Sequence, residues 1–286
     1  MKNIDDQTIG FIGLGLMGGA FALALKKNSS KLKIIAHDID NEVLKLAKAK
    51  NVIDEAFADA GEMIKQSDII FLCINPKDII IFMDKWMKSF KPGTIITDIG
   101  GCKRKICDYI EKTLRDDIDF IPGHPMAGNE KNGFINAENC NFNGKNYILV
   151  PLKRNRPENL TLLKELIYSI GFKRITETTS EDHDNKIAFT SQLCHVIASA
   201  LIDCEPDTKI TKYGGGSFED LTRIAMLNVP MWTDLFLENN DHLVKRIEQF
   251  EQSLHKLKTL IAESKSKTLS DVLENVRQRR ITMELK

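Results

Sequence analysis

Apolar and polar positions alternate in blocks over the first 178 residues of the chain, where short β-branched runs are separated by longer amphipathic stretches. Such runs are typical of buried strands, and they lie at residues 8–14, 33–39, 69–74, 94–99, 119–121, 146–150 and 172–178. The intervening stretches predict helices that begin near Met17, Asn41, Lys77, Lys103 and Pro157. Regular alternation of strand and helix predicts an α/β fold, with a doubly wound, mostly parallel sheet covered by helices on both faces.

The strand signal then ends, and the remainder of the chain has the periodicity of helices. We expect a helical stretch over residues 180–203, a glycine-rich loop at residues 214–216, a further helix from about Phe218 and a last helix behind Thr268. This change of pattern predicts an all-helical C-terminal domain behind the α/β domain.

Two domains follow from this change of periodicity, at residues 1–178 and 179–286. Within the second, six apolar side chains recur at steps of four and three. They are Leu243, Ile247, Phe250, Leu254, Leu257 and Ile261. This spacing places them on one stripe of a helix, which either faces the core of its own domain or forms a seam with a second subunit. We expect a homodimer through the helical domain.

Three glycines follow the first predicted strand in the spacing Gly13-x-Gly15-x-x-Gly18. The first permits a tight turn, the second lets the backbone approach a pyrophosphate, and the third lets the following helix pack closely. The phosphates of a dinucleotide then lie at the positive N-terminal end of that helix. The motif predicts a Rossmann-type NAD(P)-binding domain. A structural glycine turn is the alternative.

Asp38 follows the second strand, twenty residues beyond Gly18. A carboxylate there accepts hydrogen bonds from a ribose 2′-hydroxyl and repels a 2′-phosphate, so we expect NAD, with NADP as the less favoured cofactor. Further contacts are expected at the carboxyl ends of neighbouring strands. The expected cofactor-binding residues are Gly13, Gly15, Leu16, Met17, Gly18, Asp38, Ile74, Asn75 and Gly100.

Composition narrows the classes of partner. Forty Lys and Arg residues balance forty Asp and Glu residues, so no broad cationic field exists for nucleic acid or an anionic membrane, and we expect a small-molecule substrate. No apolar run approaches the roughly 20 residues that span a bilayer, and the first six residues do not resemble a signal peptide. The six cysteines show no CxxC spacing. We expect a cytoplasmic protein with reduced cysteines and no metal site.

Three polar side chains outside the glycine motif have surroundings suited to chemistry. His124 lies between a glycine and a proline, in a stiff turn that would fix the direction of a proton-accepting imidazole. His195 lies in an apolar helix, where a structural histidine is the alternative. Arg223 lies among apolar residues, so it either pairs with Asp220 or binds an anionic substrate.

These segments carry a resemblance to a known family. His124-Pro125-Met126-Ala127-Gly128 resembles the HPMAG segment of the prephenate and arogenate dehydrogenases of tyrosine biosynthesis, and Asp220-Leu221-Thr222-Arg223-Ile224-Ala225 resembles their DxTRIA segment. Pro230-Met231-Trp232 is similar to a third element of that family. The matching segments occur in the family's order over essentially the whole chain.

The resemblance implies an NAD-dependent dehydrogenase that oxidatively decarboxylates prephenate to 4-hydroxyphenylpyruvate. It implies that His124 is catalytic and takes the proton of the ring hydroxyl as a hydride leaves the same carbon for the nicotinamide. It implies that Arg223 binds a substrate carboxylate and that His195 lies near the substrate. The implied substrate-binding residues are His195, Arg223, Gln192 and Ser217.

The chain departs from the family at a few positions. Where the family usually has a serine that hydrogen-bonds the catalytic histidine, in a DxxSxK segment, this chain has Gly101. Gln192 and Cys194 replace a histidine and a proline of the family's pattern. These changes leave open whether the substrate is prephenate or arogenate.

Two other interpretations stand beside this resemblance. The opening glycine motif is also close to that of 3-hydroxyisobutyrate and 6-phosphogluconate dehydrogenases, which act on β-hydroxy acids. Those enzymes use a helical lysine where this chain offers His195. A non-catalytic NAD-sensing protein is the other interpretation, for which Gly101 is the one indication.

Overall fold

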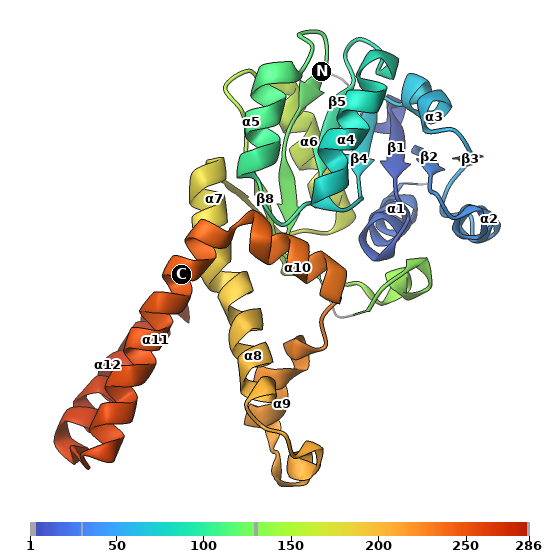
Figure 1. The fold of residues 1–286 in the computed structure, drawn as a ribbon. Coiled ribbons are helices and arrows are strands. Elements are labelled where there is room, and N and C mark those ends of the chain that lie inside the picture. Colours follow the sequence, from blue (N-terminus) through green and yellow to red (C-terminus); the bar gives the residue numbers. More distant parts are fainter. Residues whose placement is uncertain (1–3, 30, 129–130, 285–286) are drawn as a thin grey trace.

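A six-stranded parallel sheet forms the centre of the N-terminal part in the computed structural model, which describes residues 4–29, 31–128 and 131–284 (Figure 1). The strands are β1 (Thr8–Ile12), β2 (Lys33–His37), β3 (Glu55–Phe57), β4 (Ile69–Leu72), β5 (Ile95–Asp98) and β6 (Asp119–Phe120), in the order β3-β2-β1-β4-β5-β6. The order reverses its direction between β1 and β4. Ligands bind outside the carboxyl ends of the strands at such a point.

Helices cover both faces of this sheet. They are α1 (Leu16–Asn28), α2 (Asn41–Ala49), α3 (Ala60–Gln66), α4 (Pro76–Trp86), α5 (Arg104–Thr113) and α6 (Pro157–Ile170). Side chains of α1, α2 and α6 share one core with Ile69 and Phe71, whereas those of α3, α4 and α5 share the other with Ile70 and Leu72. Successive residues of β4 therefore point to opposite faces, each of which is buried. The predicted doubly wound α/β fold is confirmed.

A second, three-stranded sheet extends the α/β part. It consists of β7 (Gly123–Pro125), β8 (Asn146–Leu149) and β9 (Arg174–Glu177), with β7 antiparallel and β9 parallel to β8. The sequence pattern predicted β8 and β9 but not β7 or β3. Both missed strands are three residues long and lie at sheet edges, and β7 contains a glycine and a proline that normally mark a turn. An edge position tolerates proline because one side of the strand needs no N–H donor.

The chain is helical from residue 180 onward. Its helices are α7 (Ser180–Ile187), a π-helical turn (Ala188–Gln192), α8 (Leu193–Asp203), α9 (Gly216–Thr222), α10 (Val229–Glu238), α11 (Asn240–Ala262) and α12 (Ser266–Glu284). The helix expected over residues 180–203 is present, with the π-helical turn inside it. Figure 1 shows α8 leading away from the α/β part while α10 lies next to it. The sequence pattern did not predict α10, which has a proline in its first turn, where no backbone donor is required.

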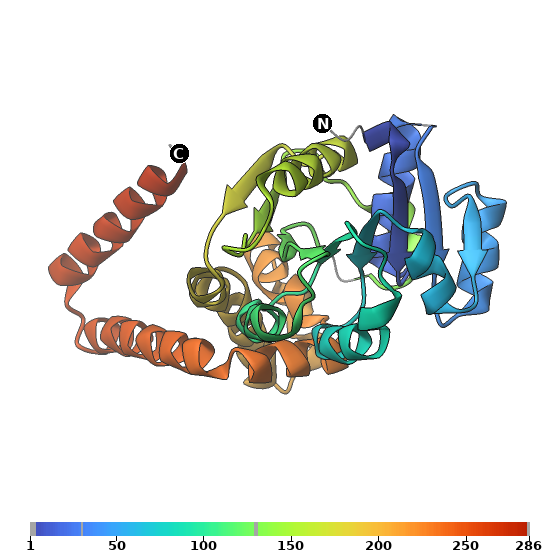
Figure 2. The same cartoon turned by 90° about the horizontal axis from the view of Figure 1, so that it is seen from above.

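Helices α11 and α12 project from the rest of the molecule (Figure 2). Of the apolar stripe on α11, Leu243 is buried, but Leu254 and Ile261 are 55% and 63% exposed. On α12, Leu273 and Val276 are also more than half exposed. The core of this chain therefore covers only the beginning of the stripe.

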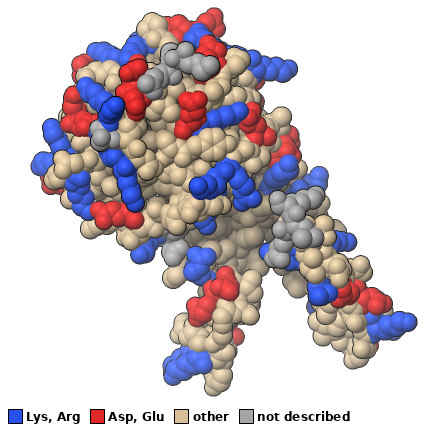
Figure 3. Space-filling view, turned by 180° about the vertical axis from the view of Figure 1, so that it is seen from behind, with Lys and Arg blue, Asp and Glu red and all other residues tan. Residues whose placement is uncertain are grey.

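Charged side chains of both signs are interspersed on the face of the molecule seen from behind (Figure 3). Among the helices described in the structure, none combines the length and the apolar character needed to cross a membrane.

Candidate active site

A cavity of about 1040 Å³ lies between the α/β part and the helical region. Its walls include Ile12 and His37 at the ends of β1 and β2, and Cys73 just behind β4. His195 of α8 and Trp232 of α10 close the opposite side. The cavity thus begins at the switch point of the sheet and ends against the helices.

The glycine motif forms the floor of one end of the cavity. Gly13 has a φ of +89°, and a Cβ there would lie 2.6 Å from the carbonyl oxygen of Cys73. A Cβ at Gly18 would lie 2.2 Å from the carbonyl oxygen of Gly13, so α1 can approach the turn only with glycine at that position. A Cβ at Gly15 would meet no protein atom within 4 Å, and Gly15 lines the cavity. No side chain caps the N-terminus of α1, so its N–H groups are available to a phosphate.

Asp38 lies at the same end, directly behind β2. Its carboxylate accepts hydrogen bonds from the backbone N–H of Leu14, at 2.6 Å, and of Asp40, at 2.8 Å. These bonds hold the carboxylate beside the glycine turn. Apart from Gly18, which packs α1 against the turn, every predicted cofactor-binding residue lines the cavity: Gly13, Gly15, Leu16, Met17, Asp38, Ile74, Asn75 and Gly100.

His124 faces the cavity from β7. The neighbouring Gly123 donates its N–H to Asp98 Oδ1 at 3.2 Å, and a Cβ at that glycine would collide with the ring of Tyr147 at 2.7 Å. The glycine therefore lets β7 lie close both to Tyr147 of β8 and to the backbone of β5, whose Asp98 carbonyl oxygen would be 3.1 Å from the same Cβ. Burial holds the pKa of His124 well below 6.5, and the nearby His183 and Lys103 lower it further. The imidazole is consequently neutral at neutral pH.

A second histidine touches this ring. Nε2 of His183 lies 2.9 Å from Nδ1 of His124, and Nδ1 of His183 lies 2.7 Å from Oδ1 of Asp184. Sequence reasoning missed both residues. Their only local signal is a pair of titratable side chains in the first turns of a predicted helix, since the contact with His124 spans 59 residues.

A buried ion pair fixes the loop behind β5. Lys103 and Asp98 are both fully buried, and Lys103 Nζ lies 2.5 Å from Asp98 Oδ2 and 2.7 Å from the carbonyl oxygen of Gly100. Asp98 also accepts the N–H of Gly100 at 2.8 Å. Because each charge has a partner and further hydrogen bonds, the pair can be buried. It holds Gly100 and Gly101 at the wall of the cavity.

His195 and Arg223 face the same cavity from the helical region. The His195 ring stacks on Trp232 with centroids 3.6 Å apart, and its Nδ1 donates to the carbonyl oxygen of Ser191 at 2.9 Å. Nε2 is then the ring atom available to a ligand. Burial lowers the pKa of His195, and the positive charge of Arg223 lowers it as well. The structure therefore brings His124, His195 and Arg223 together at one cavity.

Gln192 and Ser217 are placed differently from these three. Gln192 borders the cavity, but its amide donates to the carbonyl oxygen of Leu235 at 3.0 Å and accepts from Asn239 at 2.8 Å. These bonds favour a structural role, in which Gln192 ties the π-helical turn to α10. Ser217 is exposed on α9 and is not one of the described residues that line the cavity.

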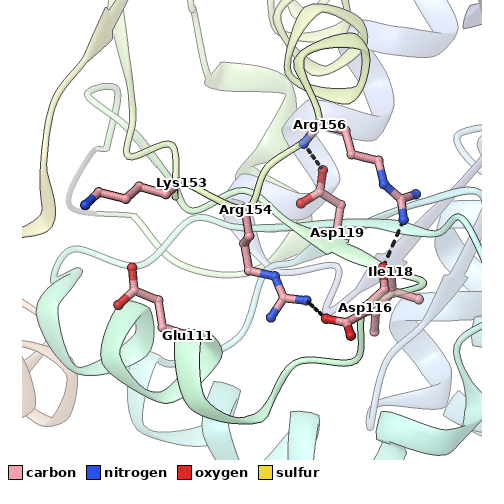
Figure 4. A pocket seen from close by; sticks show the side chains of 7 residues that line it. All are labelled: Glu111, Asp116, Ile118, Asp119, Lys153, Arg154 and Arg156. Carbon is pink, nitrogen blue, oxygen red and sulfur yellow. Dashed lines mark hydrogen bonds and ion pairs between the residues drawn. The ribbon is translucent and has the colours of Figure 1, made fainter.

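A second hollow, of about 490 Å³, lies at the end of α5 (Figure 4). Arg154 donates to the carbonyl oxygens of Leu114 and Arg115, at 3.0 and 2.9 Å, and Arg156 donates to that of Asp116 at 2.9 Å. Their guanidinium groups thus satisfy backbone acceptors behind the last turn of α5. This arrangement explains the arginines structurally.

Fold and site together define the class of protein: a nucleotide-dependent dehydrogenase with its active site between an α/β part and a helical part. Family models agree with this class. The nucleotide-binding domain of prephenate dehydrogenase matches residues 21–176, and the dimerization domain of prephenate dehydrogenase matches residues 179–275. The chain belongs to the prephenate dehydrogenase family. This assignment replaces the β-hydroxy acid dehydrogenase alternative.

Individual relatives cover nearly the whole chain. It is 29% identical to prephenate dehydrogenase of Bacillus subtilis, over 94% of this chain and 74% of that protein. A crystal structure of prephenate dehydrogenase from Aquifex aeolicus in complex with hydroxyphenyl propionate and NAD+ has a TM-score of 0.87 and 32% identity, over 99% of this chain and 100% of that one. The crystal structure of Synechocystis arogenate dehydrogenase has a TM-score of 0.81 and 28% identity, over 96% and 99%.

Proposed function

We propose that this chain is an NAD-dependent prephenate dehydrogenase that converts prephenate to 4-hydroxyphenylpyruvate and carbon dioxide in tyrosine biosynthesis. The observation that carries the proposal is one cavity that is lined both by the glycine turn with Asp38 and by His124, His195 and Arg223. Membership of the prephenate dehydrogenase family supports it. Arogenate is the alternative substrate.

His124 is the proton acceptor in this proposal. Its Nδ1 is engaged with His183, so Nε2 is the nitrogen that meets the ring hydroxyl of the substrate. Bound NAD+ supplies the hydride acceptor for the carbon that bears this hydroxyl. The hydroxyl proton passes to Nε2, and the ring carboxylate leaves as carbon dioxide, so that its bonding electrons make the ring aromatic. The proton then returns from His124 to the phenolate oxygen of the product. Aromatisation favours the products, so the protein has chiefly to orient the hydroxyl and accept its proton.

Arg223 and His195 hold the substrate in this proposal. The Arg223 guanidinium binds a substrate carboxylate through paired N–H donors, and His195 Nε2 contacts the substrate beside the Trp232 ring. His124 comes from the α/β domain, and both other residues come from the helical region. Residues 1–178 and 179–286 would then be two domains that each contribute one side of the substrate site.

NAD rather than NADP is the proposed cofactor. The Asp38 carboxylate is held beside the glycine turn at the cavity, which supports the proposal that it binds the cofactor ribose. Asp38→Asn keeps an acceptor for the Leu14 N–H but removes the charge that repels a 2′-phosphate. We expect the ratio of kcat/KM with NAD to kcat/KM with NADP to fall roughly 10- to 100-fold, as for the loss of a charged hydrogen bond. Steady-state kinetics with both cofactors measure this ratio. An unchanged ratio would show that Asp38 does not contact the ribose.

A homodimer through the helical domain is the proposed assembly. The dimerization-domain match covers the exposed stripe residues of α11, Leu254 and Ile261. Light scattering should give about twice the chain mass of 32.4 kDa for the native protein. Leu254→Glu combined with Ile261→Glu should shift it toward the single-chain mass, because two carboxylates would be buried in an apolar seam. Lys256→Glu, an exposed change on the opposite face of the same helix, is the control, and a dimer that survives the double change would place the seam elsewhere.

The experiment that tests the proposed function follows absorbance at the NADH band. Prephenate and arogenate are offered separately, each with NAD and with NADP. We expect the fastest reduction with prephenate and NAD. Reduction of the cofactor with arogenate but not with prephenate would assign the alternative substrate. Tight NAD binding without cofactor reduction by either compound would favour the non-catalytic interpretation.

A further inference from the structure

The side chains of Asp184, His183 and His124 form a hydrogen-bonded row that runs from the start of α5 to the cavity. The Asp184 carboxylate meets Nδ1 of His183 at 2.7 Å, and Nε2 of His183 meets Nδ1 of His124 at 2.9 Å. His183 is 1% exposed and Asp184 is 2% exposed. Each ring nitrogen in this hydrogen-bonded row acts either as a donor or as an acceptor. The positions of the hydrogens therefore follow from one end of the row to the other.

The first hydrogen is fixed by Asp184. Its Oδ1 also accepts the backbone N–H of Lys103 at 2.8 Å, and its Oδ2 accepts that of Arg104 at 2.9 Å. Burial acts to raise the pKa of Asp184, but the bonds from His183 and from these N–H groups lower it below 3.8. The group is therefore an ionised carboxylate, which only accepts. Nδ1 of His183 must carry the hydrogen that points at it.

The remaining hydrogens follow from the first. Burial lowers the pKa of His183, and the positive charge of Lys103 lowers it as well. Asp184 and Asp98 act to raise it, but the net shift is downward from 6.5, so the ring is neutral at neutral pH. A neutral imidazole with its hydrogen on Nδ1 has a lone pair on Nε2. That lone pair accepts from Nδ1–H of His124. Nε2 of His124 is then left with the lone pair that a proton acceptor requires.

Gly101 makes this contact more important. It has no side chain with which to orient His124, and a Cβ there would lie only 3.0 Å from Cδ2 of Leu235. A serine-sized side chain would therefore require Leu235 to move. Among the side chains that the structure describes, His183 is the one that forms a hydrogen bond with the ring of His124.

We infer that His183, held by Asp184, fixes His124 in the tautomer whose Nε2 can accept a proton, and so acts as a positioning residue for the proton transfer proposed above. This inference rests on the proposed function for its catalytic consequence. The arrangement of hydrogens itself can be tested without any substrate.

Asp184, at the far end of this hydrogen-bonded row, connects the helical region to the α/β part of the molecule. No side chain at the start of α5 caps that helix, and Asp184, from α7, accepts its first N–H groups instead. Arg104 Nη1 also lies 2.7 Å from Asp241 Oδ2. The direction of the His183 ring is thus set by contacts between the α/β part and the helical region, the same two parts that form the cavity.

Two substitutions at His183 test the roles of its two ring nitrogens separately. Gln places an acceptor near the former Nε2, whereas Asn places a donor near the former Nδ1 and leaves nothing for His124. We expect His183→Gln to retain kcat within about 10-fold. His183→Asn should lose about 10²-fold, the lower range for a general base, because the His124 ring then loses its fixed direction as well as its single tautomer. The KM for NAD should stay unchanged in both. Lys186→Gln, an exposed change on the same helix, is the matched control.

Nitrogen NMR of histidine-labelled protein gives the second measurement, because it reports which ring nitrogen carries the hydrogen. We expect the hydrogen of His124 on Nδ1 in the unaltered protein and in His183→Gln, and a mixture of tautomers in His183→Asn. A hydrogen on Nε2 of His124 in the unaltered protein would overturn the inference, as would equal kcat values for the two variants. If neither variant folds, the spectrum of the unaltered protein decides. If the protein shows the predicted tautomer but does not oxidise prephenate, the proposed function is refuted and the arrangement of hydrogens stands.

Discussion

Replacing His124 by asparagine should lower kcat by about 10² to 10⁴, the range that a positioned general base contributes. The asparagine amide can still donate to Nε2 of His183, which lies 2.9 Å from Nδ1 in the native ring. The variant therefore keeps the buried contact and loses only the atom that faces the cavity. Substrate affinity should change far less than kcat. Steady-state kinetics measure both, with the exposed His255→Asn on α11 as the control.

The pH dependence of the unaltered enzyme gives an independent check on His124. A base must be neutral to act, and burial together with His183 and Lys103 holds the pKa of His124 well below 6.5. Activity should therefore be level through neutral pH and fall only as the pH drops through this lowered value. His124→Asn should abolish that acid limb. An unaltered kcat in the variant would remove His124 from the mechanism.

Replacing Arg223 by alanine should raise the KM for the substrate about 10²-fold, or roughly 2.7 kcal/mol, with a smaller effect on kcat. The reason is the loss of a guanidinium that grips a carboxylate through two N–H donors, each charged hydrogen bond contributing about 1.5 to 3 kcal/mol. Arg223→Lys should give an intermediate KM, because lysine keeps the charge and loses the fork of donors.

A matched control separates this contact from the general attraction of a dianion. Lys212 is an exposed cation of the same region and does not belong to the described lining of the cavity. Lys212→Ala should therefore leave the KM nearly unchanged. Equal effects of Lys212→Ala and Arg223→Ala would show that Arg223 acts only through net charge.

The nucleotide end of the site could be predicted because its signals are local. The turn at Gly13, the close packing at Gly18 and the carboxylate of Asp38 each depend on a few consecutive residues and on the strand before them. The structure places Gly13 and Asp38 at the cavity, and Gly18 in the first turn of α1, where it packs against the turn at Gly13. For the same reason, the α/β alternation predicted the doubly wound sheet.

Features that depend on distant contacts could not be predicted in this way. His183 meets His124 across 59 residues, and the first turn of a polar helix gives no sign of a buried partner. Gln192 lies next to the cavity, but its amide binds Leu235 and Asn239 of a later segment. The apolar stripe predicted a buried face on α11 but gave no sign of what covers it. In the structure of the single chain, Leu254 and Ile261 are exposed.

In the proposed mechanism, one imidazole from the α/β part and one guanidinium from the helical part hold the same substrate beside the nicotinamide. A crystal structure with NAD+ and 4-hydroxyphenylpyruvate would show whether both contacts form. We expect the phenol oxygen about 2.6 to 3.2 Å from Nε2 of His124, with a carboxylate of the same molecule on Arg223. A product molecule whose phenol oxygen lies away from His124, or whose carboxylate binds elsewhere, would contradict this mechanism.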